Sequence, residues 1–261
     1  MKSSNTVRVL LIGAGLFFCL IGTAQKNIIT DKFGAIIRGD TTLKEIALVF
    51  TGDEFADGGD MIRKALSKHK IKASFFLTGN FYSNKAFQPL IRALKKEGHY
   101  LGAHSDKHLL YAPWTKRDSL LVTQDVFNAD LLMNFKRMTG FGIKKKNASW
   151  FLPPFEWYNA EIVKWTKELG LQLVNFTPGT RSTADYTYPE MGKSYRSSEE
   201  IYQSIMEYEQ KSSNGLKGFI LLIHIGTDPR RTDKFYAKLD DLLIALQREG
   251  YVFLRINDLF N

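Results

Sequence analysis

The feature that most constrains this chain is a regular alternation of short apolar runs with longer amphipathic segments. Each apolar run is rich in β-branched and aromatic residues and ends at glycine, proline or a polar loop, which is typical of a strand buried on both faces. The segments between these runs repeat apolar residues at helical spacing. We expect strands at 45–51, 72–78, 98–103, 148–152, 171–176, 218–224 and 251–256, and helices at 60–69, 86–97, 120–138, 160–169, 199–210 and 235–249.

This order predicts an α/β fold with a parallel sheet covered by helices. The chain has 261 residues and is 44% hydrophobic, so it can bury a substantial core. We find no internal repeat and no Pro/Ser-rich linker, and we therefore expect one domain over residues 25–261. About seven strand–helix units suit a closed or nearly closed barrel. The irregular stretch at 178–198 is expected to be a functional or mobile loop.

The first 24 residues form a separate segment. Lys2 and Arg8 precede an apolar run from 9 to 22, and Gly22-Thr23-Ala24 has the small residues of a cleavage site. The apolar run is shorter than the roughly 20 residues of a membrane-spanning helix. The pattern predicts a secretory signal peptide over residues 1–24, export to the periplasm or the outside of the cell, and no stable membrane insertion after cleavage.

Cysteine and charge limit the partners. The only cysteine, Cys19, lies in the predicted leader, so the mature chain would have no disulfide and could hold a metal only through His, Asp or Glu. The net charge of +9 becomes +7 when the two charges of Lys2 and Arg8 are removed. The other basic residues form short groups, which favours a solvated surface attracted to anionic glycans and argues against nucleic acid. The oligomeric state is not predicted.

Two histidines four positions apart mark the first candidate site. His104 and His108 can lie on one side of a helical turn, which is a spacing that a divalent metal accepts. Such a pair also occurs by chance among ordinary surface histidines. Here it follows the expected strand at 98–103, and in barrel folds the catalytic groups come from the carboxyl ends of strands.

In this order the motifs resemble the polysaccharide deacetylase family, also called the NodB-homology domain or carbohydrate esterase family 4, over residues 46–257. His104-Ser105-Asp106-Lys107-His108 resembles its His-[Ser/Thr]-x-x-His metal loop, and Leu222-Ile223-His224 resembles its Leu-x-His strand. The resemblance implies a deformed (β/α) barrel of about seven strands that removes N- or O-acetyl groups from glycans with an Asp-His-His metal site. Such ligands suit zinc, and cobalt or nickel also bind them.

The chain departs from the family at the first motif. The family has Thr-Phe-Asp-Asp-Gly, and this chain has Phe50-Thr51-Gly52-Asp53-Glu54. In strict register Thr51 replaces the catalytic base and Gly52 the metal aspartate. A shift of one residue makes Asp53 the third metal ligand, with Asp57 and Glu54 as alternatives. The other interpretation is an acidic loop that only caps the next helix, through Asp57 or Asp60.

A second departure accompanies the first. Phe151-Leu152-Pro153-Pro154-Phe155-Glu156 resembles the family's Arg-Pro-Pro-Tyr-Gly, with Leu152 for the arginine and Glu156 for the glycine. The family's arginine pairs with its base aspartate, so both partners are lost together and no buried charge is left unpaired. Our hypothesis is that Glu156 or Asp57 has become the base. Alternatively, Glu156 is a surface residue beside Trp157.

The remaining roles follow from the resemblance. His224 is the expected general acid, unless it is a core histidine held by the backbone. Asp185-Tyr186 weakly resembles the family's Asp-Trp, whose aspartate orients the catalytic histidine. We expect the Phe155 amide to hold the oxyanion, Leu222 to line the acetyl pocket, and Trp157 to stack on sugar together with Tyr158, Tyr186 and Tyr188.

Three functions are compatible with these residues. The first is a metal-dependent glycan deacetylase with a non-standard base. The second is a catalytically impaired pseudoenzyme that still binds glycan. The third is hydrolysis of another amide or ester.

Overall fold

A computed structural model describes residues 27–260, so the predicted signal peptide and Cys19 lie outside the described range. The strands are β1 (Ile29–Thr30), β2 (Ile36–Arg38), β3 (Glu45–Gly52), β4 (Ser74–Leu77), β5 (Tyr100–Ala103), β6 (Trp150–Phe151), β7 (Gln172–Leu173), β8 (Phe219–His224) and β9 (Val252–Leu254). The α-helices are α1 (Gly59–Lys68), α2 (Gly79–Ser83), α3 (Gln88–Lys96), α4 (Gln124–Thr139), α5 (Ala160–Glu168), α6 (Ser198–Lys211), α7 (Leu239–Arg248) and α8 (Ile256–Leu259). The short 3₁₀ helices are η1 (Lys85–Phe87), η2 (Lys145–Asn147), η3 (Pro154–Glu156), η4 (Ser182–Tyr186), η5 (Pro189–Ser194) and η6 (Phe235–Lys238).

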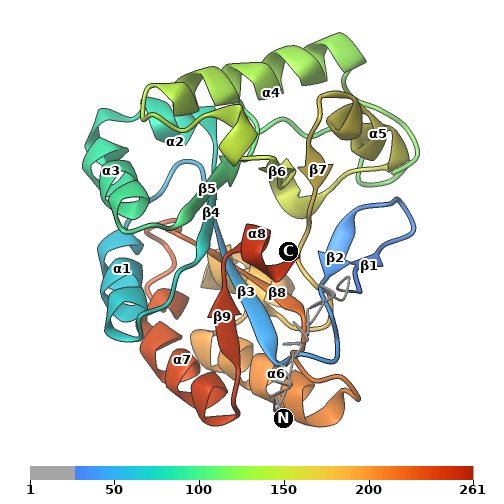
Figure 1. Ribbon diagram of the computed structural model, residues 1–261. Helices are drawn as coiled ribbons and strands as arrows, with labels where there is room; N and C mark the ends of the chain where they lie inside the picture. The colour runs from blue at the N-terminus through green and yellow to red at the C-terminus, as the bar shows by residue number, and fades with distance from the viewer. Residues whose placement is uncertain (1–26, 261) are drawn as a thin grey trace, which may run out of the picture.

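One sheet connects all the strands, with β3 at its centre. β3 pairs in parallel with β4 and β8, and near its start with β9. The sheet continues in parallel from β4 through β5 and β6 to β7, and antiparallel from β8 to β2 and β1. A bridge between Ile36 and Val174 brings the end of β7 back to β2. Helices surround this curled sheet (Figure 1), so the predicted deformed (β/α) barrel is confirmed.

The composition of β3 explains its central place. Residues 46–50 are apolar and fully buried, because neighbouring strands and helices cover both faces of the strand. Phe50 stacks on Phe75 of β4 with the ring centres 4.9 Å apart. A strand packed on both sides holds its end rigidly, so the side chains that follow Phe50 are placed precisely at the carboxyl edge of the sheet.

Two parts of the fold differ from the sequence-based expectation. The lead-in before residue 45 contains β1 and β2, which the apolar pattern missed because Arg38 is buried in the barrel wall. Its guanidinium donates to the carbonyls of Gly215 and Lys217, so the charge is satisfied inside. The helix expected from 120 begins at Gln124, because the Thr123 side chain caps it by accepting from the Val126 N–H.

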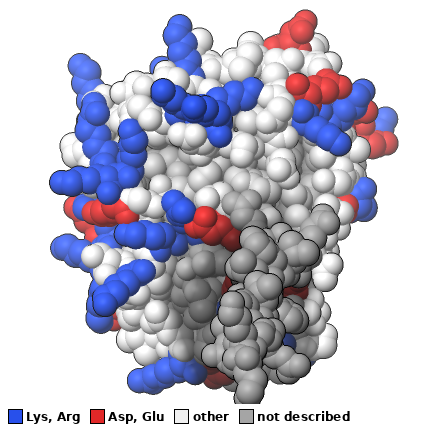
Figure 2. Space-filling view, viewed as in Figure 1, with Lys and Arg blue, Asp and Glu red and all other residues white. Residues whose placement is uncertain are grey.

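The surface agrees with the charge pattern of the sequence. On the face seen in Figure 2, Lys and Arg are spread in small groups, with Asp and Glu among them. Within residues 27–260, no helix has both the length and the apolar character needed to cross a bilayer.

Candidate active site

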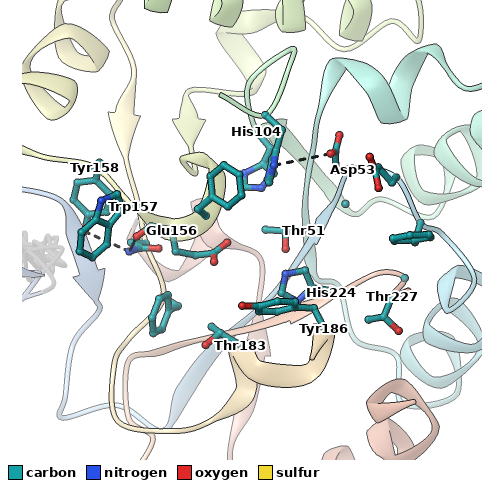
Figure 3. A pocket seen from close by; sticks show the side chains of 18 of the residues that line it. Thr51, Asp53, His104, Glu156, Trp157, Tyr158, Thr183, Tyr186, His224 and Thr227 are labelled. Carbon is teal, nitrogen blue, oxygen red and sulfur yellow. Dashed lines mark hydrogen bonds and ion pairs between the residues drawn. The ribbon is translucent and has the colours of Figure 1, made fainter. Parts of the chain in front are cut away.

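A pocket of about 950 Å³ opens where β3, β5 and β8 end. These strands are linked by parallel pairing through β3 and β4, so their carboxyl ends lie at one edge of the sheet. Most of the predicted site residues line the pocket, among them Asp53, Glu54, His104, His108, Phe155, Glu156, Trp157 and His224. Several of them point into its centre (Figure 3).

The two histidines of the first candidate site come together, although not on a helical turn. Ser105 and His108 have left-handed backbone angles, with φ of 73° and 55°, so the segment is the loop that was expected after the strand and does not form a helical turn. The ring centres of His104 and His108 are nevertheless 5.1 Å apart. His104 Nδ1 lies 2.7 Å from the Leu152 carbonyl. A proton on that nitrogen donates to the carbonyl and leaves Nε2 free to bind a ligand.

Helix α4 anchors this loop through polar side chains on one face. Asp130, Asn134 and Arg137 are spaced four and three residues apart, which places them on the same side of the helix. Asn134 Oδ1 accepts from the His104 N–H at 3.0 Å. The Asp130 carboxylate accepts from three groups of the loop, the Ser105 hydroxyl at 2.6 Å and the N–H groups of Asp106 and Lys107 at 3.0 and 2.9 Å.

Asp53 supplies the carboxylate that faces the histidines. Its Oδ1 accepts from the Thr78 hydroxyl at 2.7 Å and from Asn80 at 3.1 Å, and its Oδ2 lies 3.9 Å from His108 Nδ1. Position 52, where the strict register puts the family's metal aspartate, has no room for a side chain, because a Cβ on Gly52 would lie 2.6 Å from the Ile225 side chain. Asp53 is therefore the carboxylate next to His108.

These donors fit a divalent cation in kind. Two imidazoles and a carboxylate are the usual ligands of a catalytic zinc, and hydrogen bonds from neighbouring groups fix the His104 ring and the outer oxygen of Asp53 as they do around bound metals. No three His, Cys, Asp or Glu side chains in residues 27–260 are gathered closely enough to form a finished cluster. The 3.9 Å between Asp53 Oδ2 and His108 Nδ1 agrees with this.

Glu156 has an unusual backbone. Glu156 and Phe155 in η3 have φ of 53° and 58°, a region that non-glycine residues seldom occupy. Glu156 stands where the family motif has glycine, and its side chain extends toward Thr51 and His224 (Figure 3). Burial raises the pKa of Glu156 to about 7, although the charge of His224 acts in the opposite direction. A carboxyl with that pKa exchanges a proton near neutral pH.

Thr51 is the residue toward which the Glu156 side chain extends (Figure 3). Thr51 is paired with His224 across β3 and β8. Its hydroxyl oxygen is buried and has no hydrogen-bond partner among the described residues. The position of the family's base aspartate is thus occupied by a short side chain, and Glu156 reaches toward it from the other side of the pocket.

His224 is held by Asp185. The Asp185 carboxylate lies 2.6 Å from His224 Nδ1 and accepts from the His224 backbone N–H at 2.8 Å, and Asp185 is only 1% exposed. Burial lowers the pKa of His224, but the charge of Asp185 and its hydrogen bond outweigh burial, and the pKa is raised. The imidazole therefore tends to stay protonated, with Nε2 as its free donor.

Two predicted residues lie away from the pocket. The Asp57 carboxylate contacts Lys234 at 3.0 Å and the Tyr236 hydroxyl at 2.6 Å, and it accepts from the Thr227 N–H. Burial alone would raise the pKa of Asp57, but these contacts lower it, so the group is a poor base. Leu222 is fully buried in β8 and is absent from the pocket lining.

Other expectations have a structural answer. Helix α1 has no side-chain cap, and its N-cap residue is Gly58, so the acidic loop does not cap it. Tyr158, Tyr186 and Tyr188 line the pocket together with Trp157.

The residues that support the site were not predicted from the sequence. They include Thr78, Asn80, Asp130 and Asn134. Asp130 and Asn134 gave a signal, as polar residues on the buried face of an amphipathic helix.

Comparison with known proteins agrees with this geometry. The family model for polysaccharide deacetylase matches residues 38–174. The chain is 27% identical to the peptidoglycan-N-acetylmuramic acid deacetylase PdaA of Bacillus subtilis over 238 residues, which are 90% of this chain and 78% of PdaA. The solved structure of PdaA, a family 4 carbohydrate esterase, matches with a TM-score of 0.64 and 25% identity, covering 87% of this chain and 85% of that one.

Two further solved structures share the fold. A family 4 pseudoenzyme from Bacillus anthracis matches with a TM-score of 0.67 and 19% identity, over 87% of this chain and 69% of that one. An acetyl xylan esterase of the same family from Clostridium thermocellum, solved with a cobalt ion, matches with a TM-score of 0.64 and 20% identity, over 83% of this chain and 90% of that one.

Proposed function

Since this chain belongs to the polysaccharide deacetylase family, as a divergent member, we propose that it is a metal-dependent hydrolase that removes acetyl groups from a glycan with Glu156 as its catalytic base. The supporting observation is the left-handed backbone of Glu156. A non-glycine residue in that conformation costs about 1–2 kcal/mol, and the family's glycine would avoid the cost. Strain of this kind persists mainly where a side chain has a function.

Asp53, His104 and His108 are the residues that would hold the metal. A divalent cation bound there supplies a Lewis acid for the acetyl carbonyl and lowers the pKa of a water molecule. Zinc is the first expectation from the ligands, with cobalt or nickel as alternatives. The cobalt ion in the Clostridium thermocellum neighbour supports a divalent metal in this fold.

The other steps belong to side chains of this chain. Glu156 accepts the proton of the attacking water, and His224 gives a proton to the leaving nitrogen or oxygen of the sugar. Asp185 holds the His224 ring and keeps it protonated. A base with a pKa of about 7 and an acid with a raised pKa are in their working forms together near neutral pH. The Phe155 amide is proposed to help hold the oxyanion.

The substrate is proposed to be an acetylated glycan of the cell envelope. Several relatives are deacetylases of peptidoglycan, and one is a chitin deacetylase. Residues 1–24 are proposed to be a signal peptide that exports a single catalytic domain, residues 25–261, to the periplasm or the outside of the cell. The substrate test below distinguishes an acetyl group on nitrogen from one on oxygen.

The test is acetate release by residues 25–261 loaded with zinc. Substrates are N-acetylated chito-oligosaccharide, peptide-free peptidoglycan strands and acetylated xylan, each with and without a chelator. We expect acetate from at least one substrate, loss of release with chelator, and loss in His224→Ala. No acetate from any of them, with zinc bound stoichiometrically, would favour a glycan-binding pseudoenzyme. This is the second candidate function because Thr51 and Leu152 replace two catalytic residues of the family, and because a pseudoenzyme has the same fold.

A further inference from the structure

Arg117 lies in the pocket wall among aromatic rings. Its guanidinium carbon is 3.9 Å from the ring centre of Trp157 and 4.4 Å from that of Phe33. Its Nε donates to the Tyr158 carbonyl at 2.6 Å. Stacking and this hydrogen bond hold the planar group in one orientation before any ligand arrives.

The charge of Arg117 is poorly compensated. The side chain is half-buried, and no carboxylate in residues 27–260 forms an ion pair with it. The nearby acid, Asp31, already accepts from the Phe33 and Ala35 N–H groups and from the Tyr158 hydroxyl. Burial lowers the pKa of Arg117 more than Tyr158 and Asp31 raise it, which is the behaviour of a cation short of a partner. A guanidinium nevertheless stays charged at any physiological pH.

An aromatic wall connects Arg117 to the proposed metal loop. Trp157 contacts Trp114 with the ring centres 5.2 Å apart, Trp114 contacts Phe155 at 5.8 Å, and Phe155 contacts His108 at 4.4 Å. Trp114 is 57% exposed and Phe155 is 41% exposed, which is unusual for such large apolar side chains. Exposed aromatic faces beside a polar site suit the apolar faces of sugar rings. A glycan can therefore bind along this wall, with one sugar near His108 and another near Arg117.

A second arginine near the pocket shows what Arg117 lacks. Arg230 stacks on Tyr188 at 4.0 Å, but Asp228 accepts from its Nη2 at 2.6 Å and from its Nε at 2.9 Å. The guanidinium of Arg230 is thus already occupied by a carboxylate. Arg117 has the same stacked geometry, and in the described part of the chain it has no such partner.

We propose that the Arg117 end of the pocket is a subsite for a carboxylate-bearing sugar, so that the preferred glycan is acidic. A guanidinium fork binds a carboxylate through two parallel hydrogen bonds, whereas a neutral sugar leaves a half-buried cation unpaired. The subsite rests on the proposed function, because it names the class of glycan that the same pocket takes. The carboxylate belongs either to a lactyl ether, as in N-acetylmuramic acid, or to a uronic acid.

The test compares each acidic glycan with its own carboxyl-reduced form, in which every carboxylate is an alcohol. One arm uses an oligosaccharide of alternating N-acetylglucosamine and glucuronic acid, and the other uses peptide-free strands that contain N-acetylmuramic acid. The Kd is measured by calorimetry with zinc-loaded residues 25–261, and acetate release is followed in parallel. The variants are Arg117→Gln, Arg117→Lys and, as the matched control, Arg230→Gln.

We expect the parent to bind the acidic form of at least one pair about tenfold more tightly than the reduced form, the gain typical of a charge-assisted bidentate contact. The ratio should approach one in Arg117→Gln, fall partly in Arg117→Lys, and stay at the parent's value in Arg230→Gln. The pair that shows the preference identifies the carboxylate. Equal affinity for both members of both pairs, or a preference that survives Arg117→Gln, overturns the subsite.

The two proposals fail in different ways. A preference for the acidic form without acetate release would contradict the proposed enzyme and leave the subsite standing. Acetate release without any preference for the acidic form would support the proposed enzyme and contradict the subsite. Circular dichroism of the three variants verifies that each is folded.

Discussion

Glu156 and His224 form a pair whose environments raise both pKa values. Glu156 must lose its proton to act, and His224 must keep its own. We therefore expect kcat/KM to rise as the pH approaches about 7 and to fall at higher pH as His224 is deprotonated. Asp185→Asn removes the charge that raises the pKa of His224, so the falling limb should move to lower pH and the maximum should shrink. A pH–rate profile of both proteins measures this, and an unmoved limb would contradict the role of Asp185.

The raised pKa of Glu156 also predicts a pH-dependent stability. A pKa of about 7 in the folded state, against an ordinary value of 4.5 for glutamate, means that the folded state favours the protonated carboxyl. The stabilisation is complete below pH 4.5 and is lost as the pH rises through 7. The Glu156→Gln side chain cannot ionise. The melting temperature of this variant should therefore rise relative to that of the parent between pH 5 and pH 8.5.

The control for that comparison is Glu190→Gln at an exposed position of η5. Its difference from the parent should stay constant over the same pH range. If the difference in melting temperature between Glu156→Gln and the parent is equally constant, burial does not raise the pKa of Glu156.

The sequence predicted much of the site at the residue scale. His104 and His108 were selected by their spacing after a strand, and His224 and Asp53 by the resemblance to the family motifs. The sequence left Glu156 and Asp57 open as the base. Only three-dimensional contacts separate the two, since Lys234 and Tyr236, which are far away in the sequence, occupy Asp57.

At the scale of elements, the loop from His104 to His108 depends on α4. The loop contains two residues in left-handed conformations and has little regular structure of its own. Asp130→Asn keeps the size of the side chain but removes the charge that accepts three hydrogen bonds. We expect zinc affinity to fall about 10–100-fold, the usual effect of losing a group that orients metal ligands.

Competition with a chromophoric chelator measures that affinity without relying on catalysis. Asp125→Asn is the matched control, because Asp125 lies in the first turn of α4 and is exposed. A zinc affinity for Asp130→Asn equal to that of the control would show that α4 only packs behind the loop.

At the scale of the whole molecule, the barrel closes where the end of β7 meets β2. Thr177 follows β7, and its hydroxyl donates to the Ile37 carbonyl and accepts from the Ile220 N–H at 2.9 Å, so it links three parts of the wall. Thr177→Val is nearly isosteric and leaves both backbone groups without this partner. We expect the free energy of unfolding to fall by about 1–3 kcal/mol.

Urea denaturation measures this loss, with Thr139→Val at the exposed end of α4 as the control that should change stability by less than about 0.5 kcal/mol. A loss no larger than that of the control would mean that closure at this point adds little. The sequence predicted the strands of the barrel because most of them lie in apolar runs, of which β3 and β8 are the longest, but it missed β2, where a buried arginine interrupts the pattern.

The proposed function depends most on Glu156 as the replacement for the missing base. The direct measurement is kcat/KM for acetate release at pH 7 by the parent, Glu156→Gln and Asp57→Asn, all loaded with zinc. We predict that Glu156→Gln loses about 10²–10⁴-fold while Asp57→Asn stays within a few-fold of the parent. A fully active Glu156→Gln, or a loss confined to Asp57→Asn, would contradict the account.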